Sequence, residues 1–313
     1  MQKAVFVDYK ESDIPQAYLK RVTKLFKTSK FMARDDKNLL GELKDTEAIF
    51  AKISTKIDKE IINSAPKLKY VGVLSTAFDA IDAKLARTKG VSVCNLGGYS
   101  TEAVAEFAVA TLMERSRLLE ESKDQARKED YSFDKFMCKE VKGRVLGVVG
   151  AGKIGSRVAE MALGLGMKVL YFSRKNKPVI EKLGAKKASL DKILSESEFI
   201  SLNLILNKET EGIINASKIK LLKKGCIFIS LAPPKLIDQQ AMMKSAASGN
   251  LTFIFDHSDD IDASLAKKFL QTKNCVVYPP IAFRTEEANT ARLETFASNI
   301  EGFIKGRPQN VVN

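Results

Sequence analysis

Short apolar runs alternate with segments of helical periodicity along the whole chain. Runs of about four to eight β-branched and aromatic residues are typical of buried strands, and apolar residues spaced by three or four positions indicate a helix with one buried face. Regular alternation of the two patterns predicts parallel sheets joined by crossover helices, and therefore an α/β protein. The strands expected on this basis are Ala4–Asp8, Ala48–Ile53, Tyr70–Leu74, Val91–Cys94, Lys168–Phe172, Phe199–Leu202, Cys226–Leu231, Thr252–Phe255 and Cys275–Tyr278.

The helical segments fall between these strands and mark two units. Thr101–Leu119 is apolar on most faces, which predicts a buried helix that joins the two units or packs at a dimer interface. The charged stretch Glu120–Lys139 fits an arm over a partner subunit or a solvated surface helix and loop equally well. Between Glu286 and Lys305 the apolar spacing predicts a terminal helix that returns to the N-terminal unit. The first helices expected are Pro15–Phe26, Asp58–Ser64 and Asp82–Lys89.

A glycine-rich turn follows the apolar run Val145–Val149. Its sequence, Gly-Ala-Gly-Lys-Ile-Gly, matches Gly-x-Gly-x-x-Gly and leads into a helical pattern. In this setting the first glycine permits a tight turn, the second allows a pyrophosphate to approach, and the third allows close packing of helix on strand. The start of the helix attracts phosphate charge. The turn therefore predicts a dinucleotide site formed by Gly150, Gly152, Lys153, Ile154 and Gly155.

The end of the next strand indicates which dinucleotide is bound. An NAD-preferring site usually places a carboxylate there, about 20 residues beyond the glycines, to bind the adenosine ribose. This chain has Ser173, Arg174 and Lys175 instead. A hydroxyl and two cations can hydrogen-bond to a 2′-phosphate and neutralise it, which favours NADP over NAD. A solvated basic turn is the alternative, since lysine and arginine are common in exposed turns.

Length and composition are compatible with two packed cores. The chain has 313 residues, of which 45% are hydrophobic, and a chain of this size usually forms two domains. No run of about 18 apolar residues offers a membrane span, and Met1–Asp8 reads as a first strand instead of a signal peptide. Cys94, Cys138, Cys226 and Cys275 show no Cys-x-x-Cys spacing, which favours buried reduced thiols over disulfides or zinc ligands. We therefore expect a soluble cytoplasmic protein without a metal site.

The formal net charge is +13, because 51 lysine and arginine residues stand against 38 acidic ones. Such a balance can indicate a nucleic-acid partner, an acidic ligand or a lysine-rich surface. The basic residues are spread from Lys3 to Lys305, tryptophan is absent, and no nucleic-acid motif is present. We therefore expect an anionic small-molecule substrate and no nucleic-acid partner.

Four segments resemble the D-isomer-specific 2-hydroxyacid dehydrogenase family, and the resemblance extends over nearly the whole chain. They are Leu68–Asp82, Asn95–Glu106, Val145–Gly155 and Ser201–Asn215. The resemblance implies a Rossmann-type, doubly wound cofactor domain over residues 99–283 and a second, flavodoxin-like α/β substrate domain formed by residues 1–98 and 284–313. It also implies an active site in the cleft between the two domains and, usually, a homodimer.

The family mechanism moves a hydride between C2 of a hydroxy acid and the nicotinamide with an arginine, a histidine and a glutamate. The arginine binds the substrate carboxylate bidentately, the histidine exchanges the hydroxyl proton, and the glutamate stabilises the charged histidine. Aligned with the family motifs, this chain has Pro233, Pro280 and Ile261 at these three positions. Asp256, which faces the nicotinamide amide in the family, is retained and joins Thr101 among the expected cofactor contacts.

Other side chains close to these positions could take over the missing roles. Lys235, two residues after Pro233, could bind an anion, and His257 is the only histidine in the chain. Three aspartates near the glutamate position could replace it after a small shift of register, and a tyrosine and an arginine could approach the cleft. Each also has a structural reading, since lysine and aspartate are usually solvated and a tyrosine at a strand end is usually packed. These further candidates are Asp259, Asp260, Asp262, Tyr278 and Arg284.

Two functions remain open on these residues. The first, which we favour, is an oxidoreductase with an altered active site that transfers hydride between NADP(H), or NAD(H), and a small 2-oxo or 2-hydroxy acid or related carbonyl. The second is a cofactor-binding pseudoenzyme that acts as a sensor or partner subunit, because loss of a general acid-base alone costs a factor of about 10² to 10⁴ in rate. Pro233-Pro234 and Pro279-Pro280 would stiffen a remodelled pocket, which implies a ligand in either case.

Overall fold

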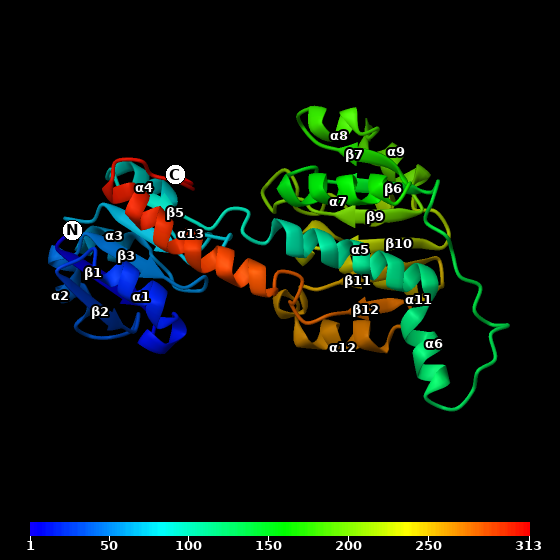
Figure 1. Cartoon of the computed structure of the whole chain (residues 1–313), viewed down its shortest axis with the longest axis horizontal. Helices are drawn as coiled ribbons and strands as arrows, with labels where there is room; N and C mark the ends of the chain where they lie inside the picture. The colour runs from blue at the N-terminus through cyan, green and yellow to red at the C-terminus, as the bar shows by residue number, and fades with distance from the viewer. The chain divides into compact units, whose positions relative to one another are not determined.

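The computed structural model describes residues 1–313, with the side chain of Asp259 left out, and the chain divides into two compact units (Figure 1). Unit 1 comprises Met1–Ser100 and Thr285–Asn313, and unit 2 comprises Thr101–Arg284. Each unit is a parallel sheet with helices on its faces. The predicted two-domain α/β fold is therefore confirmed.

The sheet of unit 1 has five parallel strands in the order β2-β1-β3-β4-β5, which is the flavodoxin-like order. Its strands are β1 (Lys3–Val7), β2 (Thr28–Met32), β3 (Ala48–Ala51), β4 (Tyr70–Val73) and β5 (Ser92–Cys94). Four of them match predicted strands to within two residues at each end. The edge strand β2 was not predicted, because its residues are polar and partly exposed and carry no apolar alternation.

Helices cover both faces of this sheet. One core contains aromatic residues of the strands together with α1 and the inner side of α13, and the other lies under α2, α3 and α4. The C-terminal helix thus packs against strands from the start of the chain. The helices of unit 1 are α1 (Gln16–Thr23), α2 (Leu39–Glu42), α3 (Lys59–Ser64), α4 (Ala83–Thr88) and α13 (Glu286–Ile304), with the 3-10 turns η1 (Glu11–Asp13) and η2 (Leu43–Asp45).

The sheet of unit 2 has seven parallel strands in the order β12-β11-β10-β9-β6-β7-β8. They are β6 (Val145–Val149), β7 (Lys168–Phe172), β8 (Lys186–Lys187), β9 (Phe199–Leu202), β10 (Cys226–Ser230), β11 (Leu251–Phe255) and β12 (Cys275–Val277). The chain builds outward from β6 in one direction and then crosses to β9 on its other side. In such doubly wound sheets a ligand binds outside the carboxyl ends of the strands where the direction reverses, here at the ends of β6 and β9.

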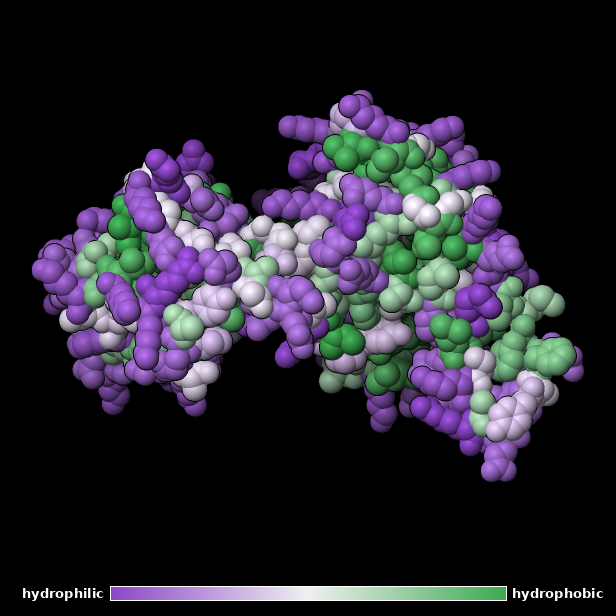
Figure 2. All heavy atoms as spheres, in the orientation of Figure 1, coloured by the Kyte–Doolittle hydropathy of each residue, from purple (hydrophilic) through white to green (hydrophobic). Residues whose placement is uncertain are grey.

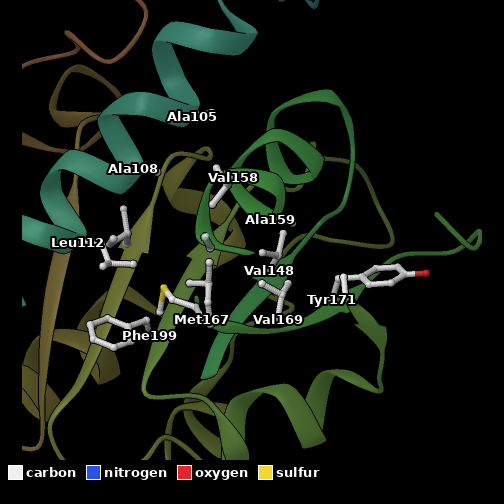
Figure 3. Packing of buried hydrophobic residues seen from close by; sticks show 14 of the residues in the cluster. Ala105, Ala108, Leu112, Val148, Val158, Ala159, Met167, Val169, Tyr171 and Phe199 are labelled. Atoms are coloured by element: carbon white, nitrogen blue, oxygen red, sulfur yellow. The ribbon is translucent and has the colours of Figure 1, made fainter. Parts of the chain in front are cut away.

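Helices α5 and α7 lie side by side over one face of this sheet, and small side chains allow their close approach (Figure 3). Arg157 of α7 joins them by donating two hydrogen bonds to the Glu102 carboxylate, of 2.7 and 2.8 Å. The helices of unit 2 are α5 (Thr101–Arg117), α6 (Leu119–Ala126), α7 (Lys153–Gly164), α8 (Pro178–Lys182), α9 (Leu190–Glu196), α10 (Ala216–Ile219), α11 (Gln239–Ala247) and α12 (Ala263–Gln271), with η3 (Pro234–Leu236) and η4 (Ser258–Asp260).

The predicted helix Thr101–Leu119 ends two residues early, at Arg117. Leu118 adopts a left-handed conformation with φ of +51°, a costly state for a leucine, and α6 starts in a new direction. The backbone N–H of Lys139 donates to the Ser116 carbonyl at 2.7 Å, so the end of the charged stretch returns to this corner. Residues 118–140 therefore form an arm anchored at both ends.

The cysteines are all free thiols. Cys94 and Cys226 are buried in strands, and burial raises the pKa of the Cys226 thiol to about 12. Cys275 is half-buried, whereas Cys138 in the arm is exposed, so the prediction that the thiols are buried is wrong for Cys138. Among the helices that the structure describes, none has the length and apolar character needed to cross a membrane.

Candidate cofactor and active site

The turn between β6 and α7 requires glycine at two positions, because neighbouring protein atoms leave no room for a side chain there. Gly150 has φ of +101°, and a Cβ there would lie 2.8 Å from the carbonyl carbon of Asn203, which follows β9. A Cβ at Gly155 would lie 2.1 Å from the Gly150 carbonyl oxygen. Only glycine fits at these two positions, because the turn touches the end of β9 and the first turn of α7 packs on the end of β6.

Gly152 differs from its two neighbours because the protein does not require a glycine there. Its φ is −77°, which any residue adopts, and a Cβ would meet no described atom within 4 Å. The helix that starts at Lys153 has no side-chain cap and no acidic residue in its first turn within the described residues. An uncapped helix start facing open space suits a phosphate group, so this part of the turn fits the pyrophosphate of a dinucleotide.

The residues after β7 lie directly beside this turn. The backbone N–H groups of Gly150 and Ala151 donate to the Phe172 carbonyl at 3.0 and 3.2 Å, so Ser173 and Arg174 follow at the same edge. Arg174 is exposed and lies 3.7 Å from an exposed carboxylate of Glu209, a pair that water screens strongly. The guanidinium therefore remains available to a bound anion.

A third cation at this edge was missed by sequence reasoning. Lys187 of β8 donates through Nζ to the Arg174 carbonyl at 3.3 Å and to Asn176 Oδ1 at 2.9 Å. Lys175, also predicted to contact the cofactor, is exposed in the same turn. Because β8 has only two residues and both are lysines, the sequence carries no pattern that would mark this strand or place Lys187 beside Arg174.

The remaining predicted cofactor contacts occupy the helix starts and the end of β11. Lys153 and Ile154 open α7, the first exposed and the second packed partly on the core, and Thr101 opens α5. Asp256 is almost completely buried at the end of β11, and its Oδ2 accepts the Ala282 N–H at 3.2 Å. All of these residues belong to unit 2.

His257 lies between two carboxylates. Its Nδ1 is 3.4 Å from Asp260 Oδ2, and its Nε2 is 3.9 Å from Asp256 Oδ1. The imidazole is half-buried, with 32% of the side chain exposed. The two carboxylates orient the ring from both sides. The predicted residues Asp256, His257 and Asp260 are therefore brought together by the structure.

We predicted that a small shift of register could bring an aspartate to the position of the family glutamate. Asp262 has a different role in the structure. Asp262 caps α12 by accepting the N–H groups of Ser264 and Leu265 at 2.8 and 3.3 Å, and its hydrogen bonds to Ser264 hold its pKa below the usual range. Ile261 packs against the apolar core of unit 2. The side chain of Asp259, another candidate, lies outside the described residues.

The other catalytic candidates lie in different surroundings. Tyr278 packs its ring edge-on against Phe107 of α5, with centroids 5.2 Å apart, and burial and then Glu114 raise its pKa. Lys235 is exposed in η3, where its carbonyl accepts the Gly212 N–H at 2.9 Å. The tyrosine thus has a packing role, and the lysine side chain projects from the loop that follows β10.

The proline pairs shape the loops after β10 and β12. Pro233 is half-buried and Pro234 is buried at the start of η3, and Pro280 is half-buried after β12. Arg284, the last residue of unit 2, is exposed. None of the three prolines offers a hydrogen-bond donor.

Comparison with known proteins agrees with this architecture. Residues 109–282 match the family model described as D-isomer specific 2-hydroxyacid dehydrogenase, NAD binding domain. The chain is 31% identical to a glyoxylate reductase of Thermococcus litoralis, over 100% of this chain and 97% of the relative. It is 30% identical to a hydroxypyruvate reductase of Blautia hydrogenotrophica, over 89% and 88% of the two chains.

A solved structure shows the same fold over both units. The D-lactate dehydrogenase of Aquifex aeolicus, complexed with NAD and lactic acid, superposes with a TM-score of 0.84 and 29% identity, covering 97% of this chain and 96% of that chain. The fold is thus shared with this dehydrogenase over nearly the whole of both chains. This chain belongs to the D-isomer-specific 2-hydroxyacid dehydrogenase family.

Proposed function

We propose that this protein transfers hydride between NADP(H) and a small 2-oxo or 2-hydroxy acid, with the cofactor on unit 2 and the substrate on unit 1. The proposal rests on the open space in front of Gly152. This space lies where the strand order of the sheet reverses, in a chain that belongs to the dehydrogenase family. Relatives are named glyoxylate reductase and hydroxypyruvate reductase, and one is complexed with lactic acid. Glyoxylate and hydroxypyruvate are small 2-oxo acids, and lactate is a 2-hydroxy acid, which suggests the substrate class.

The preference for NADP over NAD rests on the charge at the end of β7. Arg174 and Lys175 are exposed beside the glycine turn, and Lys187 is hydrogen-bonded to the same turn. A 2′-phosphate carries nearly two negative charges, and an arginine fork with two lysines can bind its oxygens. The turn itself carries no carboxylate that would bind the two ribose hydroxyls of NAD and repel a phosphate.

Reduction of a 2-oxo acid needs a proton at the carbonyl oxygen, and His257 is the side chain best placed to provide it. A bound NADPH supplies the hydride that C2 receives. Asp256 and Asp260 orient the imidazole from two sides, and histidine exchanges protons readily near neutral pH. Lys235, in the loop after β10, is a second candidate at the carboxyl edge of this sheet, where its ammonium group could bind an anion.

A homodimer through the arm is part of the proposal. The arm of residues 118–140 carries four exposed large apolar side chains, and Figure 2 shows green atoms of hydrophobic residues over the arm, at the lower right of the view. Gln125 holds the arm in shape by donating to the Ser132 carbonyl at 2.5 Å. An ordered segment with an apolar tip suits a second copy of the chain. The exposed side chains are Leu119, Tyr131, Phe133 and Met137.

The free thiols fit a reducing compartment, so the proposal includes a cytoplasmic location. Its central test is oxidation of NADPH by the purified protein with glyoxylate, hydroxypyruvate and pyruvate, with NADH in parallel. Turnover that requires both the oxo acid and the protein is expected, with a lower KM for NADPH than for NADH. Tight NADPH binding without turnover of any of the three acids would contradict the hydride transfer and favour a cofactor-binding pseudoenzyme.

A further inference from the structure

Helix α13 runs antiparallel to the strands of unit 1, so its N-terminal part, which contains Arg292, lies near the carboxyl ends of these strands. Near the C-terminus of the helix, Phe303 contacts Tyr70, the first residue of β4, with ring centroids 5.1 Å apart. Two turns earlier, Phe296 contacts Phe50, next to the last residue of β3, at 5.2 Å. One turn further toward the N-terminus is Arg292, which therefore lies at the carboxyl edge of the sheet.

Arg292 lies on the inner side of its helix, although it is charged. Ala288 and Phe296, four positions to either side, are buried, as is Asn299, which donates to the Asn95 carbonyl at 2.9 Å. Residues at these spacings share one face of a helix. The side chain of Arg292 is accordingly half-buried.

No carboxylate neutralises Arg292 within the described side chains. Its Nη2 donates to Asn289 Oδ1 at 2.9 Å, and none of the ion pairs of unit 1 includes it. By contrast, Arg21, which packs on the outer side of the same helix, pairs with Glu294 and Glu301 at 2.8 and 2.5 Å. A partly desolvated guanidinium has five donors in a planar fork and favours an anionic partner.

Two tyrosines share this edge with Arg292. Tyr9 follows β1 and donates to the carbonyl of Ala51, the last residue of β3, at 3.2 Å. Tyr99 follows β5 and is half-buried. Burial raises the pKa of both phenols, and the charge of Arg292 acts on both in the opposite direction. Because both tyrosines follow the carboxyl ends of parallel strands, they belong to the same edge of the sheet as Arg292.

We propose that Arg292 binds the carboxylate of the substrate, in place of the family arginine whose position is taken by Pro233, and that Tyr99 donates a further hydrogen bond to it. This inference rests on the proposed function, because it assigns a role to Arg292 in recognising the same 2-oxo acid. The planar fork of arginine matches a carboxylate bidentately, which lysine cannot do.

The test compares Arg292→Met, Arg292→Lys and a control, Arg87→Met, which removes an exposed arginine of α4. Steady-state kinetics would give KM for glyoxylate and kcat separately. Loss of a bidentate charge-assisted pair is expected to raise KM by about 10- to 100-fold in Arg292→Met, with partial rescue in Arg292→Lys. The control should keep the KM of the wild type. An unchanged melting temperature, followed by circular dichroism, would show that each variant is folded.

A binding measurement separates this inference from the proposed function. Titration calorimetry with oxalate, a dicarboxylate that hydride cannot reduce, requires no turnover. If the wild type binds oxalate without reducing any oxo acid and Arg292→Met does not bind it, the carboxylate site stands and the hydride transfer fails. A wild-type KM in an active Arg292→Met would overturn the inference alone. No oxalate binding by an inactive wild type would overturn both.

Discussion

Gly152 and Gly155 stand three residues apart in one turn, and the structure predicts opposite effects for the same substitution. In Gly152→Ala the new methyl group meets no protein atom within 4 Å, and φ of −77° suits alanine. Alanine restricts the unfolded chain more than glycine but is a poorer residue at the N-cap of α7, so the free energy of unfolding should change by less than about 1 kcal/mol. The methyl group occupies the space assigned to the pyrophosphate. Loss of two charge-assisted hydrogen bonds, at about 1.5 kcal/mol each, would weaken NADPH binding about 100-fold.

In Gly155→Ala the new Cβ would lie 2.1 Å from the Gly150 carbonyl oxygen. Helix α7 must then move away from β6, and a core shift of this kind costs about 1–3 kcal/mol. The melting temperature should fall by about 2–4 °C for each kcal/mol in a unit of this size. The two variants thus distinguish a loss of NADPH affinity from a loss of folding stability.

The assay pairs NADPH fluorescence titration with thermal unfolding followed by circular dichroism. Gly152→Ala should lose affinity and keep its melting temperature, whereas Gly155→Ala should lose melting temperature. An unchanged dissociation constant in Gly152→Ala, within about twofold, would refute the reasoning, because a ligand in front of the turn has to contact that methyl group. The pyrophosphate would then lie elsewhere on the unit.

Three further outcomes are expected at the site and the arm. Arg174→Ser combined with Lys187→Ala should weaken NADPH binding by about 10- to 100-fold, since two charged contacts are lost, and leave NADH binding nearly unchanged in the same titration. His257→Gln should lower kcat by about 10²- to 10⁴-fold in the reductase assay, with an unchanged dissociation constant for NADPH. Phe133→Asp should convert a dimer to a monomer in sedimentation equilibrium, because an aspartate at the apolar tip would be desolvated in the interface.

The cofactor variant and the arm variant each have a matched control. Lys182→Ser removes a cation from α8 and should leave the preference for NADPH in place. Lys128→Glu changes charge on the arm without removing an apolar side chain, and the dimer should persist. Equal losses for NADH and NADPH in the double variant would contradict the 2′-phosphate site. A wild type that is a monomer at micromolar concentration would contradict the dimer before any variant is made.

The strands that the sequence predicts well are those buried on both faces. Phe199–Leu202 and Cys226–Ser230 are buried at every position and mostly apolar, because helices cover both sides of a parallel sheet. Thr28–Met32 gives no such signal. It is an edge strand held by its pairing with β1, a contact between distant segments that local residue preferences do not contain.

The end of α5 was misplaced for a similar reason. Leu118 is neither a glycine nor a proline, so nothing in its neighbourhood marks a turn. Its left-handed conformation accompanies a hydrogen bond between Lys139 and Ser116, which are 23 positions apart. Contacts of that range depend on the path of the arm, and a helical pattern that continues through the corner cannot reveal them.

The residues of the candidate site also divide into those that a local sequence pattern marks and those that only the fold brings together. The glycine turn and the basic residues after β7 are local segments, so their chemistry could be predicted from spacing alone. Lys187 and Arg292 come from elements whose neighbours are set by sheet order and helix direction, and only the fold brings them to an edge. The aspartates after His257 illustrate the limit, since one of them is used as a helix cap.

The return of α13 to unit 1 has a consequence for synthesis on the ribosome. The first hundred residues emerge early, yet Phe50 and Tyr70 are covered by Phe296 and Phe303 of a helix made last. Roughly 180 residues of unit 2 are translated in between, which takes about 10 to 40 s at typical elongation rates. During that interval unit 2 can fold as an uninterrupted segment, while the nascent unit 1 exposes an aromatic surface to its surroundings. A chain that stops before Glu286 would keep that surface exposed and would be a target for chaperones and proteases.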